Sequence, residues 1–434
     1  MNKQYDLIVV GAGPAGLMSA ITAARGGLNV LVVEQKTDIA WIPRTCVSTL
    51  YTTDCNGELV TVDGDRWIFH KNDFSIKYTG QWKDCWKFYH ISPSGYRIRI
   101  ERDTVPAGKA FNKETLIEDL AKEAKKSGVR IQCGTRAVDI KNLKKGVVLT
   151  LNRRGKEEKL KARFAIGADG LNSIICEKLG LNKYRRSYGV MAVCSYVLEG
   201  VKPAYPDTIM CFVGKGKMKS RYIFYGWPRP ARTKGDKNQW ELLYTQFVGG
   251  NNLEAPLQAF MKDGNYASWF KKAKVVQKRG CVMSMRVALP YPRVENTILV
   301  GDAPCWTEVE VQSAIQYGYR AGKGVLDELK GDPGLDEYTD YWKNTYEYLE
   351  PGRTERANWG YVIYVLDDDD LDYLFKLMDN KILKGYYEWK VMDYVRQVLE
   401  AELPRIAKER PSLVPKIKNL LPPHQLSLRK FVSI

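Results

Sequence analysis

Three glycines near the start of the chain are spaced so that the backbone of a turn can approach a phosphate group. They stand in the segment Gly11-Ala-Gly13-Pro-Ala-Gly16, after the apolar run Tyr5–Val10 and before a helical pattern that continues to about Arg25. Gly11 permits the tight turn, Gly13 bares the backbone for a pyrophosphate, and Gly16 lets the helix pack closely on the strand. The helix N-terminus then faces the phosphates, because its N–H groups and its dipole favour negative charge.

An acidic residue follows the second apolar run, at the position where a ribose is expected. Val30–Val33 is typical of a strand, and Glu34 comes directly after it, where its carboxylate can accept hydrogen bonds from a ribose 2′-hydroxyl. A glycine turn alone is weak evidence, because a purely structural strand-to-helix turn has the same pattern. Here strand, turn, helix, second strand and acid follow at the required spacing, so the sequence predicts a dinucleotide-binding unit.

Two later segments place an aspartate just after a glycine at the end of an apolar run. The first is GADGLNS at 167–173, which contains Asp169, and the second is the strand-like run 297–300 followed by GDA, which contains Asp302. A strand that delivers a Gly-Asp turn can present a carboxylate to the hydroxyls of a polyol. The alternative for Asp302 is a turn or helix-capping aspartate, which is common. Small residues recur behind it at helical spacing, at Ala314, Gly318 and Ala321.

Together with the glycine turn, these segments resemble three motifs of the flavoprotein superfamily of aromatic hydroxylases and geranylgeranyl reductases, in the superfamily's order. The resemblance implies a Rossmann-like domain (GR2 type) that binds FAD. It also implies that Asp169 and Gly170 support the cofactor-binding loop and that Asp302, after Gly301, binds the ribityl chain of FAD.

Two further segments favour the geranylgeranyl reductase branch. PRTC at 43–46 resembles that branch's short motif of a basic residue followed by a cysteine, although Val47 replaces the usual glycine. The resemblance implies that Cys46 lies near flavin and substrate. RYIFYGWPRP at 221–230 resembles the branch's aromatic motif, with Tyr225 and Trp227 among the best matches. The alternatives are a small buried cysteine and an aromatic strand of the core.

The expected site departs from the superfamily in two places. Lys109 stands where the superfamily has an arginine that contacts the cofactor, ahead of a helix expected at 111–128 with Asn112 at its start. Glu308 and Glu310 replace the usual glycines after Asp302, and they either suit a helix start or face the flavin. The residues expected at the cofactor are Gly11, Gly13, Pro14, Ala15, Gly16, Glu34, Gln35, Arg44, Thr45, Cys46, Lys109, Ala137, Asp169, Gly170, Gly301 and Asp302, and those expected at the reacting atoms are Cys46, Tyr225 and Trp227.

The order of elements predicts an α/β fold with an inserted sheet. We expect a discontinuous FAD-binding domain at 1–84, 103–187 and 287–330, and an antiparallel substrate-binding sheet domain at 85–102 and 188–286. A helical C-terminal region is expected at 331–434. No second dinucleotide loop is evident in the sequence. The flavin is therefore expected to be reduced by a donor that visits transiently, or by an acidic electron carrier such as ferredoxin.

Composition limits the class of protein. The 434 residues have ordinary globular proportions, and their formal net charge of +17 fits an acidic partner or an anionic membrane surface, with no nucleic-acid motif. The nine cysteines lack metal-site spacing, so no metal is expected. The sequence contains neither a secretion signal nor an apolar run that could span a bilayer. We therefore expect a cytoplasmic protein, with peripheral contact to the inner face of the membrane left open.

The resemblance implies an FAD-dependent oxidoreductase that reduces carbon–carbon double bonds of an isoprenoid, or of another apolar substrate, by hydride transfer from reduced flavin. One alternative, an FAD-dependent aromatic monooxygenase, shares its cofactor motifs. Another, an electron-transfer or quinone-linked flavoprotein, is suggested by the positive charge and by the lack of a second dinucleotide loop. Only the segments around Cys46 and Trp227 distinguish the reductase from the monooxygenase.

Overall fold

The first sheet is the framework of the part of the molecule that carries the glycine turn. A computed structural model describes residues 5–218, 221–232, 237–247, 252–351, 353, 366–384 and 391–418. In it, an 8-stranded sheet has the order β11 (Arg130–Gln132), β2 (Val30–Val33), β1 (Tyr5–Val10), β14 (Lys156–Gly167), β13 (Gly146–Arg153) and β12 (Thr135–Leu143), with β21 (Thr297–Leu299) paired to β14 and β20 (Arg293–Val294) paired to β21.

The parallel strands of this sheet end at one edge. β1 pairs in parallel with β2 and with β14, so Val10 lies beside both Val33 and Gly167. β14 pairs in parallel with β21, which places Gly167 beside Leu299. The chain segments that follow these positions therefore meet at the carboxyl ends of the strands, where sheets of this kind bind ligands.

Two helices pack against each other through small residues. They are α1 (Pro14–Arg25) and α5 (Val311–Lys330). A Cβ atom at Gly318 would lie 2.3 Å from the carbonyl oxygen of Ala15, and one at Gly322 would lie 2.6 Å from that of Ser19. Only glycine allows this approach, so the small-residue face predicted for the later helix is confirmed.

Further helices complete this part of the molecule. In α2 (Lys113–Lys126), the Asn112 side chain accepts a hydrogen bond from the backbone N–H of Thr115, as its predicted place at the helix start requires. Gly128 follows with φ of 89°. The remaining helices here are α3 (Ile174–Lys178) and α6 (Gly334–Thr345), with short 3-10 turns at Leu181–Tyr184 and Glu347–Leu349.

The second sheet is also 8-stranded and mainly antiparallel. Its order is β19 (Lys274–Arg286), β15 (Ser187–Glu199), β18 (Gln239–Phe247), β17 (Tyr222–Arg229), β16 (Thr208–Gly214), β8 (Lys87–Ile91), β9 (Arg97–Glu101) and β22 (Ile382–Leu383). β22 comes from the region for which the sequence predicted only helices. It pairs in parallel with β9. The described part of that region is otherwise mostly helical, and the proposed division into domains stays a prediction.

Each face of the second sheet carries its own helices. One apolar layer lies between the sheet and α4 (Glu254–Asp263) with the 3-10 turn Ala267–Phe270. Another lies between the sheet and α8 (Asp368–Met378), α9 (Val391–Glu409) and α10 (Leu413–Lys418). Two small sheets, β3 (Thr49–Tyr51) with β10 (Gly108–Phe111) and β7 (Trp82–Cys85), and β4 (Val60–Asp63) with β5 (Arg66–Phe69) and β6 (Phe74–Lys77), complete the strands.

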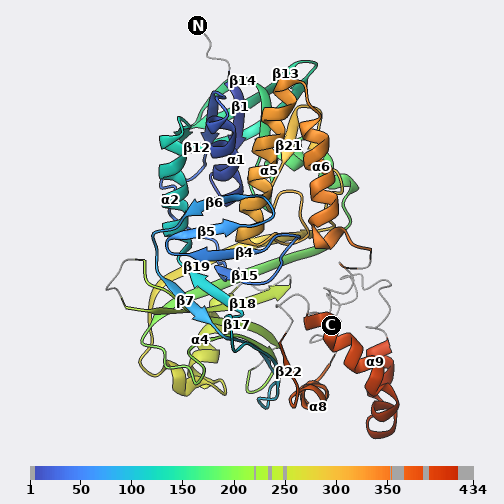
Figure 1. Cartoon of the computed structure of the whole chain (residues 1–434). Coiled ribbons are helices and arrows are strands. Elements are labelled where there is room, and N and C mark those ends of the chain that lie inside the picture. The colour runs from blue at the N-terminus through green and yellow to red at the C-terminus, as the bar shows by residue number, and fades with distance from the viewer. Residues whose placement is uncertain are drawn as a thin grey trace.

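Figure 1 shows the first sheet with α1, α2, α5 and α6 at the top and the second sheet below it, with α8 and α9 at the lower right. The predicted fold class, an α/β chain with an inserted antiparallel sheet and helices towards its C-terminus, is confirmed. Among the described residues, none of the helices is both long enough and apolar enough to cross a bilayer.

Candidate active site

A cavity of about 320 Å³ lies at the edge where the parallel strands of the first sheet end. Most of the residues predicted at the cofactor line it, although they come from distant parts of the chain. These residues are Gly11, Gly13, Pro14, Ala15, Glu34, Gln35, Arg44, Cys46, Ala137, Asp169, Gly170, Gly301 and Asp302. The register of β1, β2, β14 and β21 brings them together.

The glycine turn leaves the backbone bare at one end of the cavity. Gly11 has φ of 103°, and a Cβ atom there would lie 2.4 Å from the carbonyl oxygen of Ala168. At Gly13 a Cβ atom would meet nothing within 4 Å, so this α-carbon lies against open space. Glu34 fixes the turn, because its carboxylate accepts a hydrogen bond of 2.8 Å from the backbone N–H of Ala12. A bare turn at the N-terminus of α1 fits the pyrophosphate of FAD.

Asp169 holds the adjoining turn in place. Its carboxylate accepts hydrogen bonds from the Ser173 hydroxyl, at 2.6 Å, and from the backbone N–H of Ile175, at 3.2 Å. Burial raises the pKa of Asp169, and the hydrogen bond from Ser173 opposes that effect. This carboxylate therefore organises the start of α3 while the neighbouring Gly170 lines the cavity.

A cationic bridge stands where the loop after β2 meets the loop after β21. Arg44 Nη1 lies 2.6 Å from Asp302 Oδ2, and Arg44 Nη2 lies 3.5 Å from Glu308 Oε2. Burial alone would lower the pKa of Arg44, but the carboxylates of Asp302 and Glu308 outweigh it and raise that pKa. Burial raises the pKa of Glu308, with Arg44 acting in the opposite direction. Arg44 thus allows two carboxylates to share one cavity.

Glu310 keeps a backbone conformation that belongs to glycine. It lies directly before α5 with φ of 66° and ψ of 154°, a region that is almost restricted to glycine. A residue with a side chain thus occupies a backbone conformation that glycine adopts without strain. Both Glu308 and Glu310 line the cavity. The carboxylates are therefore part of the site, and Glu310 also marks the helix start.

Cys46 lines the cavity, whereas its neighbour Thr45 points away from it. The Thr45 hydroxyl donates a hydrogen bond of 3.1 Å to Glu241 in β18. The sulfur of Met283 lies 3.9 Å from Arg44 Nη2. Burial raises the pKa of the Cys281 thiol, and Arg44 opposes this. Sulfur-bearing side chains of β19 thus lie beside the Arg44 end of the cavity.

Several predicted residues lie elsewhere. Lys109 does not line the cavity, because its ammonium lies 2.5 Å from the Asp84 carboxylate on the neighbouring strand β7. Trp227 is 1% exposed and belongs, with the partly buried Tyr225, to the apolar layer beneath α8 and α9. Gly16 is packed inside, where a Cβ atom would meet Gly11 O at 2.0 Å. Direct roles for these residues, and for Thr45, in binding or reaction stay predictions.

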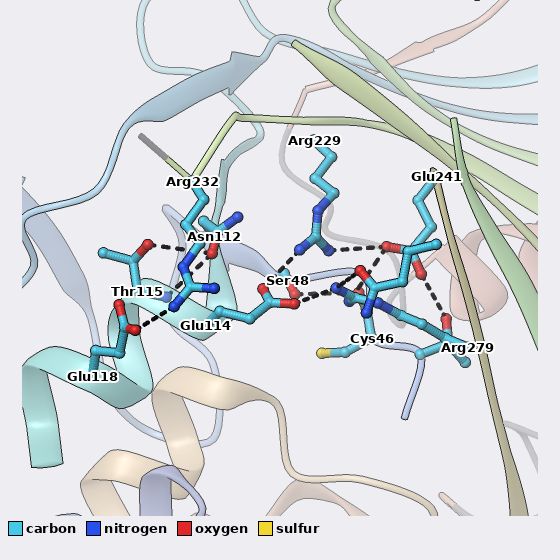
Figure 2. Close-up of polar contacts among 12 residues, drawn as sticks. Cys46, Ser48, Asn112, Glu114, Thr115, Glu118, Arg229, Arg232, Glu241 and Arg279 are labelled. Carbon is cyan, nitrogen blue, oxygen red and sulfur yellow. Dashed lines mark hydrogen bonds and ion pairs between the residues drawn. The ribbon is translucent and has the colours of Figure 1, made fainter. Parts of the chain in front are cut away.

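The structure adds residues that the sequence analysis missed. Lys113, Thr135, Arg136 and Asn172 also line the cavity. Asn172 lies inside the predicted segment 167–173 and the other three lie in or beside predicted elements, but none of the four had a predicted role at the cofactor. A second omission is a set of buried charges next to Thr45: Glu114 of α2 with Arg229, Glu241 and Arg279 of the second sheet (Figure 2). Their segments lie far apart in the sequence, so spacing could not reveal them.

The fold and the cavity define an FAD-dependent oxidoreductase. The chain belongs to the FAD binding domain family, whose model matches residues 4–241. The predicted cofactor, FAD, and the predicted resemblance to the reductase branch are confirmed.

Known proteins of that branch resemble this chain over different lengths. A digeranylgeranylglycerophospholipid reductase of Methanococcus vannielii is 26% identical over 442 residues, which cover 97% of this chain and 99% of that protein. Digeranylgeranylglycerophospholipid reductase 1 of Methanosphaera stadtmanae is 30% identical over 179 residues, covering 41% of this chain and only 40% of that protein. A geranylgeranyl bacteriochlorophyll reductase-like protein from Thermoplasma acidophilum has the same fold, with a TM-score of 0.70 at 18% identity over 97% of this chain and 100% of that one.

Proposed function

We propose that this protein reduces carbon–carbon double bonds in the isoprenoid chain of an apolar lipid. The observation that carries the proposal is that Cys46, from the segment typical of the reductase branch, lines the same cavity as the glycine turn and Asp302. The relatives of Methanococcus vannielii and Methanosphaera stadtmanae, whose names specify digeranylgeranylglycerophospholipids, support this substrate class.

The residues of the cavity have separate tasks in such a reaction. FAD, when bound and reduced, supplies a hydride from N5 of its ring. The glycine turn and the N-terminus of α1 would hold the pyrophosphate, and Asp302, which lines the same cavity, would bind the ribityl hydroxyls. Arg44 offsets the charge of Asp302 and Glu308. Glu308, whose pKa is raised by burial although Arg44 opposes the effect, would supply a proton to the carbon next to the one that receives the hydride.

The residue after Cys46, Val47, borders an apolar layer that would suit an apolar substrate. Val47, Met191, Tyr225, Cys281 and Met283 are partly buried and pack against the apolar layer between the second sheet and the C-terminal helices. A hydrocarbon chain placed against such side chains loses contact with water, which is the main source of its binding energy. A charged or strongly polar substrate would gain nothing from this layer.

The electron donor and the place of action belong to the same proposal. An isoprenoid lipid resides in a bilayer, so in this proposal the enzyme reaches its substrate from the membrane surface. The net charge of +17 supports attraction both to an anionic lipid surface and to an acidic carrier such as ferredoxin. Reduction by ferredoxin should then slow as salt rises, because screening weakens long-range attraction. A rate of reduction by ferredoxin that does not depend on ionic strength would contradict this part of the proposal.

The decisive experiment uses the purified FAD-loaded protein, reduced without air. Mixed with a polyprenyl glycerophospholipid in detergent, it should be reoxidised while the lipid gains two mass units per saturated bond, as checked by mass spectrometry. Rapid formation of an oxygenated flavin on mixing with air, with no lipid product, would instead indicate a monooxygenase. Cys46→Ser should lower lipid turnover while bound flavin stays unchanged. Normal turnover of that variant would remove the thiol from the reaction.

A further inference from the structure

A closed ring of buried charges joins helix α2, which packs beside the first sheet, to the second sheet. Arg229 Nη2 lies 2.7 Å from Glu114 Oε2, and Arg229 Nη1 lies 3.2 Å from Glu241 Oε2. Arg279 also contacts both carboxylates, through Nη2 to Glu114 and through Nη1 to Glu241 at 3.7 Å. We call these four residues the ionic ring. Glu114 stands in the first turn of α2, whereas the other three lie on β17, β18 and β19 of the second sheet.

The ring is charge-balanced and almost fully withdrawn from water. No member's side chain is more than 9% exposed. Burial alone would raise the pKa of Glu114, but Arg229 and Arg279 outweigh it and lower that pKa. Buried ions are costly, and an apolar set of similar volume often gives equal or greater stability. A ring of this kind is therefore better explained by the geometry that it fixes than by the stability that it adds.

One carboxylate oxygen of the ring faces the segment that carries Cys46. Glu241 Oε2 contacts both arginines, while Oε1 accepts hydrogen bonds from the Ser195 hydroxyl, at 2.7 Å, and from the Thr45 hydroxyl, at 3.1 Å. Thr45 is 6% exposed and lies between Arg44 and Cys46, whose side chains line the cavity. Figure 2 shows Cys46 and Ser48 beside the ring.

Each end of this segment is also fixed. The carbonyl oxygen of Pro43 accepts a hydrogen bond of 2.9 Å from the backbone N–H of Gly280, next to Arg279 of the ring. The Ser48 hydroxyl donates to the carbonyl oxygen of Cys46 at 3.2 Å, and Ser48 itself has φ of 51°. A serine in that conformation is held there by its surroundings rather than by its own preference. Thr45 is thus the side-chain link between a segment in a constrained conformation and the ring.

We propose that the ionic ring is a positioning device for the thiol of Cys46, and that it acts through the hydrogen bond from Thr45 to Glu241. The ring fixes the position of Glu241 Oε1 on the second sheet relative to Glu114 on α2. Thr45 is held against that oxygen, so the side chains on either side of it are directed into the cavity. In this role Thr45 and the four ring residues act through Cys46 as positioning residues, and none of these five residues lines the cavity. The inference rests on the proposed function only for its turnover readout.

The test compares two valine substitutions on purified, FAD-loaded protein. Thr45→Val removes the hydroxyl that links the segment to Glu241 and keeps the shape of the side chain. Thr245→Val is the matched control, because within the described residues the buried Thr245 hydroxyl on the same strand as Glu241 has no hydrogen-bond partner. Thr45→Ser should keep the hydrogen bond to Glu241. This variant separates the effect of losing the hydroxyl from the effect of changing the size of the side chain.

The main readout is the alkylation rate of Cys46 by a maleimide, followed by peptide mass spectrometry. Cys133, which is partly exposed and lies outside the cavity lining, serves as the internal reference. We expect Thr45→Val to change the Cys46-to-Cys133 rate ratio by threefold or more (on the order of 0.7 kcal/mol) and to shift the flavin absorption bands. Thr45→Ser and Thr245→Val should match the parent protein in both measurements.

Turnover supplies a second, separable readout. With a polyprenyl lipid, Thr45→Val should lower kcat more than it raises KM, because the substrate surface is intact and only the thiol is displaced. If Thr45→Val leaves the alkylation ratio, the flavin bands and kcat unchanged, or if Thr45→Ser behaves like Thr45→Val, the inference is overturned. A changed alkylation ratio without any lipid reduction by the parent protein contradicts the proposed function and leaves the inference supported.

Discussion

The guanidinium of Arg44 lies 2.6 Å from the carboxylate of Asp302, although 258 positions separate them in the chain. The first belongs to the loop after β2 and the second to the turn after β21, and both line the cavity. The pair joins the two loops where they line the cavity. Asp302 also accepts a hydrogen bond of 3.1 Å from the backbone N–H of Val309, which fixes the loop that carries Glu308.

Replacing Arg44 by Gln should weaken FAD binding, because Asp302 and Glu308 then lose the cation that contacts both of them and the loops that carry them lose their link. We expect a loss of tenfold or more in affinity, on the order of 1.4 kcal/mol. Titration of the apoprotein with FAD, followed by flavin fluorescence, gives the affinity. Arg66→Gln, at an exposed position on β5, is the control and should bind FAD normally. Equal affinity for the two variants would contradict a binding role for Arg44.

Gly13→Ala should separate cofactor binding from folding. A Cβ atom at this position meets nothing within 4 Å, so the apoprotein should keep its stability within roughly 1 kcal/mol. The same methyl group occupies the space that a pyrophosphate needs, so the dissociation constant for FAD should rise by about tenfold or more. Calorimetry of FAD binding and thermal unfolding of the apoprotein test both halves. Unchanged FAD affinity would place the pyrophosphate elsewhere.

Glu308 should make the stability of the apoprotein depend on pH. Burial raises its pKa in the folded state, so the folded protein holds this proton more tightly than the unfolded chain does. The corresponding stability is present at low pH and is lost as pH rises through the raised pKa. Glu308→Gln removes the effect. The Tm of this variant relative to the parent should therefore increase as pH rises through the raised pKa of Glu308. Glu177→Gln, on the exposed side of α3, should show no such trend.

Glu310→Gly should stabilise the protein, because φ of 66° with ψ of 154° is strained for any residue with a side chain. The gain expected for the free energy of unfolding is about 1–3 kcal/mol. Glu310→Ala is the matched variant, since it removes the carboxylate and keeps the strain. Urea unfolding of the apoproteins distinguishes them. Equal stability of the glycine and alanine variants would show that charge, rather than backbone strain, governs this position.

Glu114→Gln should destabilise the protein strongly, because it leaves Arg229 and Arg279 with a single buried carboxylate between them. Breaking a buried ion pair in this way costs about 3–5 kcal/mol. Glu118→Gln is the control on the same helix, where the carboxylate pairs with the exposed Arg232. Exposed pairs contribute about 0–1 kcal/mol. Urea unfolding that gives both variants the same loss would contradict the importance of burial for the ionic ring.

The sequence by itself determined the cofactor end of the site. The turn at Gly11–Gly16, the acid at Glu34 and the aspartates Asp169 and Asp302 each depend on a local pattern, in which a strand ends in a turn of restricted composition. Such patterns are visible over a few residues, because the backbone conformation of the turn dictates the residue types. The α/β class and the small-residue face of α5 could be predicted for the same reason.

Only the tertiary structure decided how the end of the cavity that contains Arg44 and Cys46 is arranged. Whether Lys109 reaches the cofactor, whether Thr45 and Cys46 face the same way, and which charges surround Arg44 depend on partners such as Asp84, Glu241 and Glu308 that lie far away in the chain. The ionic ring of Glu114, Arg229, Glu241 and Arg279 belongs to the same category. Charge pairing and burial are properties of neighbours in space, and a sequence specifies neighbours only along the chain until the fold brings the others together.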